Sequence, residues 1–130
     1  MTTPRTWLER AEIIPGRSLT RSKAPGRLWP VGTGPHYCDG GDGAYILTPD
    51  GRHLDMLCAL GAISLGYRED QLAGPGVMWR RYPSVCSLPN VKEVLAAEAI
   101  LAHVAPWASQ VKFVKTGTEA TLGALMIAQR

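Results

Sequence analysis

The sequence predicts an α/β fold, and two features of the chain lead to this prediction. Short segments rich in strand-forming residues follow one another between residues 36 and 57, with turn residues between them. A helical pattern, a β-branched run, a loop and a second helical pattern follow between residues 90 and 130, as in half of an α/β unit. The 45% hydrophobic and 19% charged residues are typical of a folded globular chain.

The first 57 residues are predicted to form one helix and three short antiparallel strands. Pro4 after Thr2 and Thr3 favours a capped helix that runs to about Ile13. Residues 16–35 are rich in glycine and proline and predict an irregular connection. The strands are expected at residues 36–38, 44–47 and 52–57, with turns at residues 39–43 and 48–51.

The second half is predicted to be mainly helical. Residues 57–67 are small and apolar, which suits close packing, but no secondary structure is predicted for them. Asn90 followed by Glu93 indicates a capping box, and apolar residues then recur at helical spacing to about residue 105. Residues 111–115 predict a strand and residues 120–129 a helix.

Composition argues against several classes of protein. The net charge of +3 comes without a basic run, so no nucleic-acid interface is expected. No apolar stretch reaches the length of a membrane span and the N-terminus has no signal-peptide core, so a soluble, cytoplasmic protein is expected. Cys38, Cys58 and Cys86 are far apart and form no CxxC pair, which indicates ordinary buried thiols and no metal site.

The segment at residues 116–120 lies between the predicted strand and the last helix, where α/β proteins commonly present ligand sites. Amides at the start of a helix lack intrahelical partners and carry partial positive charge, so they attract phosphate. Gly117 lets the backbone approach a ligand closely, and the Thr118 hydroxyl adds a donor. These residues fit a phosphate-binding loop.

The same segment also fits a capping box. In that arrangement the Thr116 side chain caps the helix while Glu119 accepts from the Thr116 amide. Spacing alone favours the capping box, because Thr-x-x-Glu before a helix is common. The two interpretations are compatible.

The chain as a whole resembles the class III aminotransferases, especially their glutamate-1-semialdehyde 2,1-aminomutase-like branch. Residues 111–120 are similar to the family pattern VRFVNSGTEA, the most specific piece, and residues 43–55 are similar to GAYLWDVDGNRYID. Shorter similarities follow the family's order at residues 14–16, 65–67 and 87–93. Because the match runs over residues 13–130, the chain is identified as a member of this family that matches its N-terminal part only.

The resemblance implies a fold type I enzyme that uses pyridoxal 5'-phosphate (PLP) as its cofactor. Residues 1–56 would form an N-terminal helix, a linker and the β segment of the small domain. Residues 57–130 would begin the large PLP-binding α/β domain, which is incomplete here. Carried over to this chain, the cofactor-binding residues are Thr116, Gly117 and Thr118.

Two further residues are implied on the substrate side. Ser22 lies in a segment similar to a serine-containing substrate-side loop of the family. Leu60 occupies the position at which the aminomutases carry a tryptophan beside the substrate, and Ala62 replaces a proline. These departures favour an aminotransferase-like relative that acts on another carbonyl substrate.

The resemblance assigns no catalytic residue to this chain. The Schiff-base lysine of the family lies downstream of the matched part, and Lys115 does not occupy its position. The implied function is transfer of an amino group from a small-molecule donor to a carbonyl acceptor by a homodimer, of which this chain is an N-terminal fragment. Residues 79–82, which are basic and aromatic, fit a contact between subunits.

Two other functions stay open. The chain could serve as a non-catalytic interaction or remnant module derived from the family, or as a phosphate-binding module that uses Gly117 and Thr118. Because residues 111–115 would lack neighbouring strands, the isolated chain is expected to be poorly soluble or molten.

Overall fold

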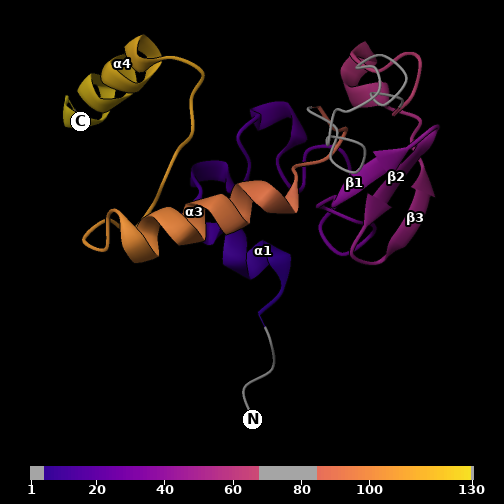
Figure 1. Cartoon of the computed structure of the whole chain (residues 1–130), viewed down its shortest axis with the longest axis horizontal. Helices are drawn as coiled ribbons and strands as arrows, with labels where there is room; N and C mark the ends of the chain where they lie inside the picture. Colours follow the sequence, from indigo (N-terminus) through magenta and orange to yellow (C-terminus); the bar gives the residue numbers. More distant parts are fainter. Residues whose placement is uncertain (1–4, 68–84, 130) are drawn as a thin grey trace, which may run out of the picture.

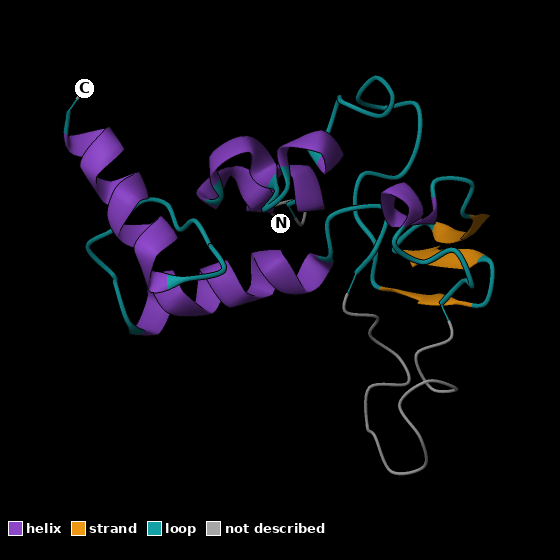
Figure 2. Ribbon diagram, turned by 90° about the horizontal axis from the view of Figure 1, so that it is seen from above, coloured by secondary structure: helices purple, strands orange, loops and turns teal. Residues whose placement is uncertain are grey.

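The computed structural model describes residues 5–67 and 85–129. These parts hold helices and one three-stranded antiparallel sheet (Figures 1 and 2), which confirms the α/β prediction. The helices are α1 (Trp7–Arg10), α3 (Val91–His103) and α4 (Gly117–Ala128). Figure 1 shows the sheet at one end of the molecule and α4 at the other, with α1 and α3 between them.

The sheet has the order β1-β2-β3, with β1 at Gly40–Asp42, β2 at Tyr45–Thr48 and β3 at Gly51–Leu54. The predicted turn between β2 and β3 is confirmed, because Thr48 pairs with Gly51 across it. The Thr48 hydroxyl also donates to the Gly51 carbonyl oxygen at 2.9 Å. A hydrogen bond inside the turn thus fixes the register of this hairpin.

The predicted turn at residues 39–43 is wrong, because most of this segment forms strand β1. Gly40–Asp42 form a strand that pairs with β2, and the ring of Tyr67 lies against Gly41, where a Cβ would fall 2.2 Å from the ring. The predicted strand at residues 36–38 is wrong except for one parallel bridge between Cys38 and Asn90. Cys38 makes its main-chain bonds to residues at the start of α3, so it cannot extend the sheet.

The N-terminal helix begins later than predicted, and its cap is Thr6. The Thr6 hydroxyl accepts from the Glu9 amide at 3.3 Å, and the Glu9 carboxylate accepts from the Thr6 amide at 2.7 Å. Residues 1–4 lie outside the described part. The predicted end is confirmed, since the helix continues as a 3-10 turn at Ala11–Ile13.

Three more 3-10 turns lie in segments for which no regular structure was predicted. They are Pro15–Arg17, Arg21–Lys23 and Cys58–Gly61. The first two interrupt the glycine- and proline-rich connection, which is otherwise irregular as expected. Residues 79–82 lie outside the described residues.

The capping box predicted for the long helix is confirmed in α3. The Asn90 side chain accepts from the Lys92 amide at 2.9 Å, and the Glu93 carboxylate accepts from the Asn90 amide at 3.3 Å. Arg10 of α1 donates to both carboxylate oxygens of Glu98 in α3, at 2.8 and 2.6 Å. This bidentate pair joins the two helices.

Two clusters of buried side chains form the core. The first joins α3 to the N-terminal helix and consists of Ala11, Ile14, Tyr37, Val91, Val94 and Ala97. The second lies against the sheet and consists of Cys38, Ile46, Tyr67, Cys86 and Leu88. Because neighbouring residues 37 and 38 belong to different clusters, this short segment links the two halves of the core.

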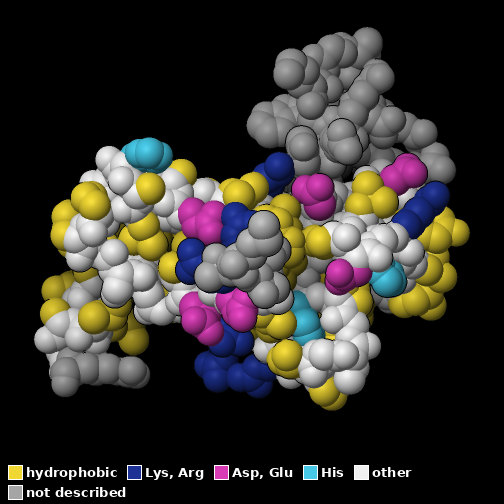
Figure 3. All heavy atoms as spheres, turned by 90° about the horizontal axis from the view of Figure 1, so that it is seen from below, with side chains coloured by type: hydrophobic (Ala, Val, Ile, Leu, Met, Phe, Trp, Pro, Cys, Tyr) yellow, Lys and Arg dark blue, Asp and Glu magenta, His cyan; other side chains and the backbone are white. Residues whose placement is uncertain are grey.

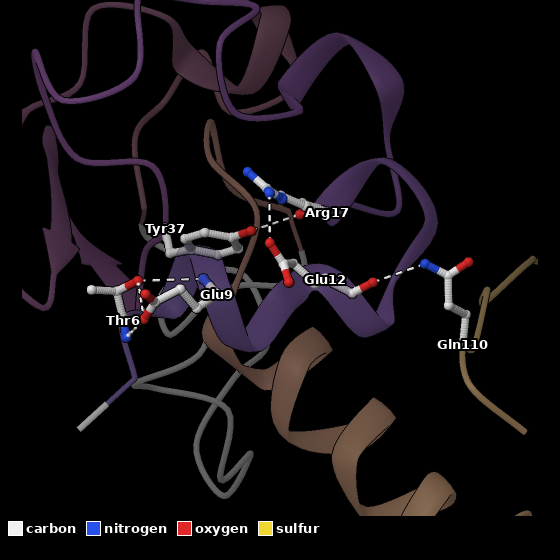
Figure 4. Close-up of polar contacts among 6 residues, drawn as sticks. All are labelled: Thr6, Glu9, Glu12, Arg17, Tyr37 and Gln110. Atoms are coloured by element: carbon white, nitrogen blue, oxygen red, sulfur yellow. Dashed lines mark hydrogen bonds and ion pairs between the residues drawn. The ribbon is translucent and has the colours of Figure 1, made fainter. Parts of the chain in front are cut away.

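Polar contacts tie the connecting segments to the N-terminal helix (Figure 4). The Tyr37 hydroxyl donates to the Arg17 carbonyl oxygen at 2.8 Å, and the Arg17 guanidinium pairs with Glu12 at 2.8 Å. The Gln110 side chain donates to the Glu12 carbonyl oxygen at 2.9 Å. The N-terminal segment is therefore hydrogen-bonded to Gln110, which is far from it in the sequence.

Residues 111–115 do not form the predicted strand. The described residues place no strand beside them, and the Val111 amide instead donates to the Ile13 carbonyl oxygen at 2.8 Å. The last helix is confirmed in α4, which begins earlier than predicted and buries no residue. Among the helices of the described segments, none is long and apolar enough to cross a membrane.

Candidate functional site

The loop that enters α4 contains the three residues predicted to bind a cofactor phosphate. Thr116 caps the helix, and its hydroxyl accepts from the Glu119 amide at 3.2 Å. The Glu119 carboxylate accepts from the amides of Lys115 and Thr116 at 2.7 and 3.1 Å. The capping box that the spacing favoured is therefore present.

This capping box leaves two amides of the first turn open. Among the described residues, the amides of Gly117 and Thr118 have no hydrogen-bond acceptor. Both residues are exposed, and a Cβ on Gly117 would meet nothing within 4 Å, so the turn has free space beside it. Two open amides and a hydroxyl at a positive helix end have the chemistry that a phosphate group requires.

A second polar site, which the sequence analysis did not predict, consists of Asp55, Tyr67 and Ser87 and is here called the Asp55 cluster. The hydroxyls of Tyr67 and Ser87 both donate to the Asp55 carboxylate, the latter at 2.6 Å. The amides of Leu57 and Cys58 donate to the same carboxylate at 2.9 and 3.1 Å. The carboxylate therefore has four donors.

Hydrogen bonding decides the ionisation of the Asp55 cluster. Burial by itself would raise the pKa of Asp55, but the hydrogen bonds from Ser87, Tyr67 and the two amides outweigh it and lower this pKa below its ordinary value of 3.8. Burial, together with the hydrogen bond to the Asp55 carboxylate, raises the pKa of the Tyr67 hydroxyl. The cluster therefore holds an ionised carboxylate between two neutral hydroxyls at neutral pH.

The Asp55 cluster brings together three of the segments that carry the family resemblance. Asp55 is the last residue of the segment 43–55, Tyr67 is the last residue of the segment 65–67, and Ser87 is the first residue of the segment 87–93. A signal for the cluster was present in the sequence, because each polar residue stands at the edge of a matched segment. Spacing alone could not reveal it, since Asp55 and Ser87 are 32 residues apart.

The structure does not bring the predicted site residues together. Ser22 is exposed in the 3-10 turn Arg21–Lys23, and Leu60 is 60% exposed in the 3-10 turn Cys58–Gly61. Thr118 lies in α4, at the end of the molecule opposite to the sheet (Figure 1). The assignments of Ser22, Leu60 and the phosphate loop remain predictions.

No disulfide joins any two of the three cysteines, and the expectation of buried thiols holds for two of them. Cys38 and Cys86 are buried, and Cys58 is half-buried. Hydrogen bonding to Cys86 and burial raise the pKa of the Cys38 thiol, so it stays protonated and unreactive. Within the described residues, no group of three or more acidic, histidine or cysteine side chains is placed to hold a metal ion.

Several relatives of this chain are glutamate-1-semialdehyde 2,1-aminomutases. The chain is 30% identical over 128 residues to the enzyme of this name from Natronomonas pharaonis, a match covering 96% of this chain and 27% of the relative. The enzymes of the same name from Pyrobaculum neutrophilum and Aeropyrum pernix are 32% and 36% identical, over 93% and 91% of the chain.

These matches cover nearly all of the chain but little of each relative. The chain spans between 26% and 28% of the length of these curated relatives. No family model matches the chain, and no solved structure matches it significantly. The matched part is the N-terminal part of the relatives, as the resemblance predicted. The chain therefore belongs to the class III aminotransferase family, in which it matches the N-terminal part of the glutamate-1-semialdehyde 2,1-aminomutases.

Proposed function

We propose that this chain is the N-terminal part of a PLP-dependent enzyme that transfers an amino group to a carbonyl substrate. The observation that carries the proposal is the pair of open amides at Gly117 and Thr118, in the segment with the most specific resemblance to the family. When bound, PLP supplies an electron sink for charge that develops on the substrate carbon. The contribution of this chain is to bind the phosphate group and so to orient the ring.

The phosphate loop would act through its backbone. The amides of Gly117 and Thr118 would donate to phosphate oxygens, and the Thr118 hydroxyl would add a third donor. Thr116 would not bind the phosphate through its hydroxyl, because that hydroxyl accepts from the Glu119 amide and so fixes the shape of the turn. No residue of this chain is assigned a proton-transfer step, because the activated lysine is not expected in this part of the enzyme.

The partners and the substrate follow from the family. We propose a small-molecule amino donor, a carbonyl acceptor and a cytoplasmic homodimer. Leu60 in place of a tryptophan favours an aminotransferase over an aminomutase, because an aliphatic side chain offers a substrate neither a ring face nor an indole donor. Ser22, which is exposed, would supply a hydroxyl on the substrate side.

Calorimetric titration with pyridoxamine 5'-phosphate tests the phosphate loop, because this ligand lacks the aldehyde that reacts with surface lysines. Thr118→Val should weaken binding about five- to tenfold, the effect of one lost hydrogen bond. Thr121→Val is the matched control, because the Thr121 hydroxyl donates to the Gly117 carbonyl oxygen at 3.0 Å inside α4. It should leave the affinity within about twofold of that of the original chain.

Titration with pyridoxamine, which has no phosphate, supplies the second control and should give no binding. Equal affinity for the two ligands would contradict the phosphate loop. So would equal effects of Thr118→Val and Thr121→Val.

A second candidate function is a non-catalytic interaction module. It is favoured by the apolar side chains that α4 exposes, which are Leu122, Leu125, Met126 and Ile127. Exposed apolar residues on one helix are typical of a surface that another polypeptide covers. Light scattering on the purified chain tests this candidate, and a monodisperse monomer at every concentration would count against it.

A further inference from the structure

A cavity of about 410 Å³ lies beside the sheet, where the irregular connection meets β2, β3 and the residues that follow β3. Its volume falls in the range of cavities that bind small molecules, about 300–1,000 Å³. It is here called the Trp29 cavity. Apolar side chains form most of its wall. They are Trp29, Ile46, Leu54, Met56, Leu57 and Leu88.

The Trp29 indole contributes an unpaired donor to this cavity. Its Nε1 atom is buried, and among the described residues no atom accepts a hydrogen bond from it. A buried N–H group without an acceptor is costly, and in a folded protein it calls for an explanation. The Trp29 ring stacks on the ring of His36, with 6.3 Å between the ring centroids, so packing fixes its orientation.

Gly34 lies against this nitrogen and lines the same cavity. A Cβ at residue 34 would fall 2.9 Å from Nε1, so a side chain here would crowd the indole. Within the described part of the chain, the main chain of Gly34 makes no hydrogen bond. A small displacement of Gly34 would therefore open Nε1 to an acceptor in the cavity.

The other polar side chains of the wall have partners or lie at the surface. The Thr33 hydroxyl donates to a main-chain carbonyl oxygen at 2.7 Å, and the Ser87 hydroxyl donates to Asp55. His53 is exposed. The Trp29 N–H is therefore the buried group that selects for a ligand acceptor.

Asp55, which also lines the cavity, determines the charge that a ligand can carry. Its carboxylate is ionised and already accepts from four donors. Because a carboxylate has about four lone-pair sites, Asp55 has none left for a donor on a ligand cation. Its negative charge would repel a ligand anion. A neutral ligand is therefore favoured.

We propose that the Trp29 cavity binds a neutral, mainly apolar molecule whose carbonyl oxygen accepts a hydrogen bond from the Trp29 Nε1 atom. The apolar part of the ligand would contact Ile46, Leu57 and Leu88. The proposal does not depend on the amino-transfer function, because it uses no residue of the phosphate loop.

Three probes of nearly the same shape test the proposal on the 130-residue chain. Acetophenone is neutral and has a carbonyl oxygen, α-methylstyrene has a methylene group in place of that oxygen, and benzoate is an anion. Acetophenone should bind about tenfold more tightly than α-methylstyrene, because it gives an unpaired donor its acceptor. Benzoate should bind about tenfold more weakly than acetophenone, or less tightly still. Nuclear magnetic resonance measures the affinities from the methyl signals of Ile46 and Leu88.

The indole N–H signal of Trp29 reports the hydrogen bond itself, and its loss in Trp29→Phe identifies it. Acetophenone should move this signal further downfield than α-methylstyrene does, because the two probes share an aromatic ring and differ in the acceptor. The indole signal of Trp107 is the control. Because Trp107 is 86% exposed and does not line the cavity, its signal should not move.

A variant without the donor separates the hydrogen bond from apolar contact. Trp29→Phe keeps an aromatic ring, so its affinities for acetophenone and α-methylstyrene should agree within about twofold. Trp107→Phe is the matched control and should keep the full preference for acetophenone. If Trp29→Phe does not fold, Gly34→Ala takes its place, because its Cβ would keep an acceptor away from Nε1.

The outcomes are distinct. A preference for acetophenone that Trp29→Phe removes and Trp107→Phe keeps would support the proposal. Equal affinity of the original chain for acetophenone and α-methylstyrene, binding of benzoate as tight as that of acetophenone, or no binding of any probe would overturn it. So would a Trp29 signal that shifts with protein concentration and not with acetophenone, because a second copy of the chain would then occupy the cavity.

Discussion

Gly41 shows how one missing side chain shapes this molecule. It lies beneath the ring of Tyr67, and the ring carries the hydroxyl that donates to Asp55. A methyl group at residue 41 would displace the ring and with it the Asp55 cluster. One aromatic residue thus contacts both the strand β1 and the polar site beside it.

Gly41→Ala is predicted to lower the free energy of unfolding by about 2–3 kcal/mol, because its Cβ would lie 2.2–2.5 Å from ring atoms of Tyr67. Gly123→Ala is the control. Residue 123 lies within α4 with nothing within 4 Å of an added Cβ, so alanine should stabilise by about 0.5–1 kcal/mol. Urea unfolding measures both changes, and a destabilisation of the same size at the two positions would contradict this account.

The elements of the chain differ in how much tertiary packing supports them. α3 buries Val91, Val94 and Ala97 and is joined to α1 by the bidentate pair of Arg10 with Glu98. α4 has a capping box of the same type but buries no residue. Helical stability in proteins comes mostly from packing. Loss of the cap should therefore lower the stability of the whole molecule in α3 but only the local helicity in α4.

Asn90→Ala is therefore predicted to lower the global free energy of unfolding by about 1 kcal/mol, the usual cost of a lost cap on a packed helix. Thr116→Ala should reduce the helicity of α4 and leave the global midpoint nearly unchanged. Circular dichroism and urea unfolding of the two variants make the comparison. A large global effect of Thr116→Ala would show that α4 packs against the rest of the molecule.

At the scale of the whole molecule, charged and apolar residues are distributed unevenly. Apolar side chains are exposed at the end formed by α4 and at the end formed by the sheet (Figure 3). Leu54, Met56 and Leu65 are among those near the sheet. This distribution agrees with the prediction that the isolated chain is poorly soluble, which stays a prediction.

Acid should destabilise the whole molecule through the Asp55 cluster. The pKa of Asp55 is lowered in the folded state, so its contribution to stability is complete above its ordinary value of 3.8 and is lost as the pH falls through the folded-state value. Glu98, whose pKa is lowered by its hydrogen bonds with Arg10, adds to the same trend. The free energy of unfolding should therefore decline below about pH 4.

Urea unfolding as a function of pH measures this decline. Asp55→Asn should flatten it, because the amide does not titrate. An unchanged slope in this variant would show that Asp55 does not cause the acid sensitivity.

The sequence by itself determined the local features of this protein. The capping boxes of α3 and α4, the turn at residues 48–51 and two of the three strands could be predicted, because each depends on residues within a few positions of one another. The family and the open amides at the start of α4 were also accessible from the sequence.

Only the tertiary structure decided the rest. β1 pairs with β2 where the Tyr67 ring lies against Gly41, and residues 111–115 are not a strand because the described chain gives them no neighbouring strand. Cys58, Ala59 and Leu60 have positive φ values, and the Ala59 amide donates to the hydroxyl of Ser87, which is 28 residues away. A sequence pattern reports contacts between near neighbours, whereas these features depend on contacts that exist only once distant segments have met.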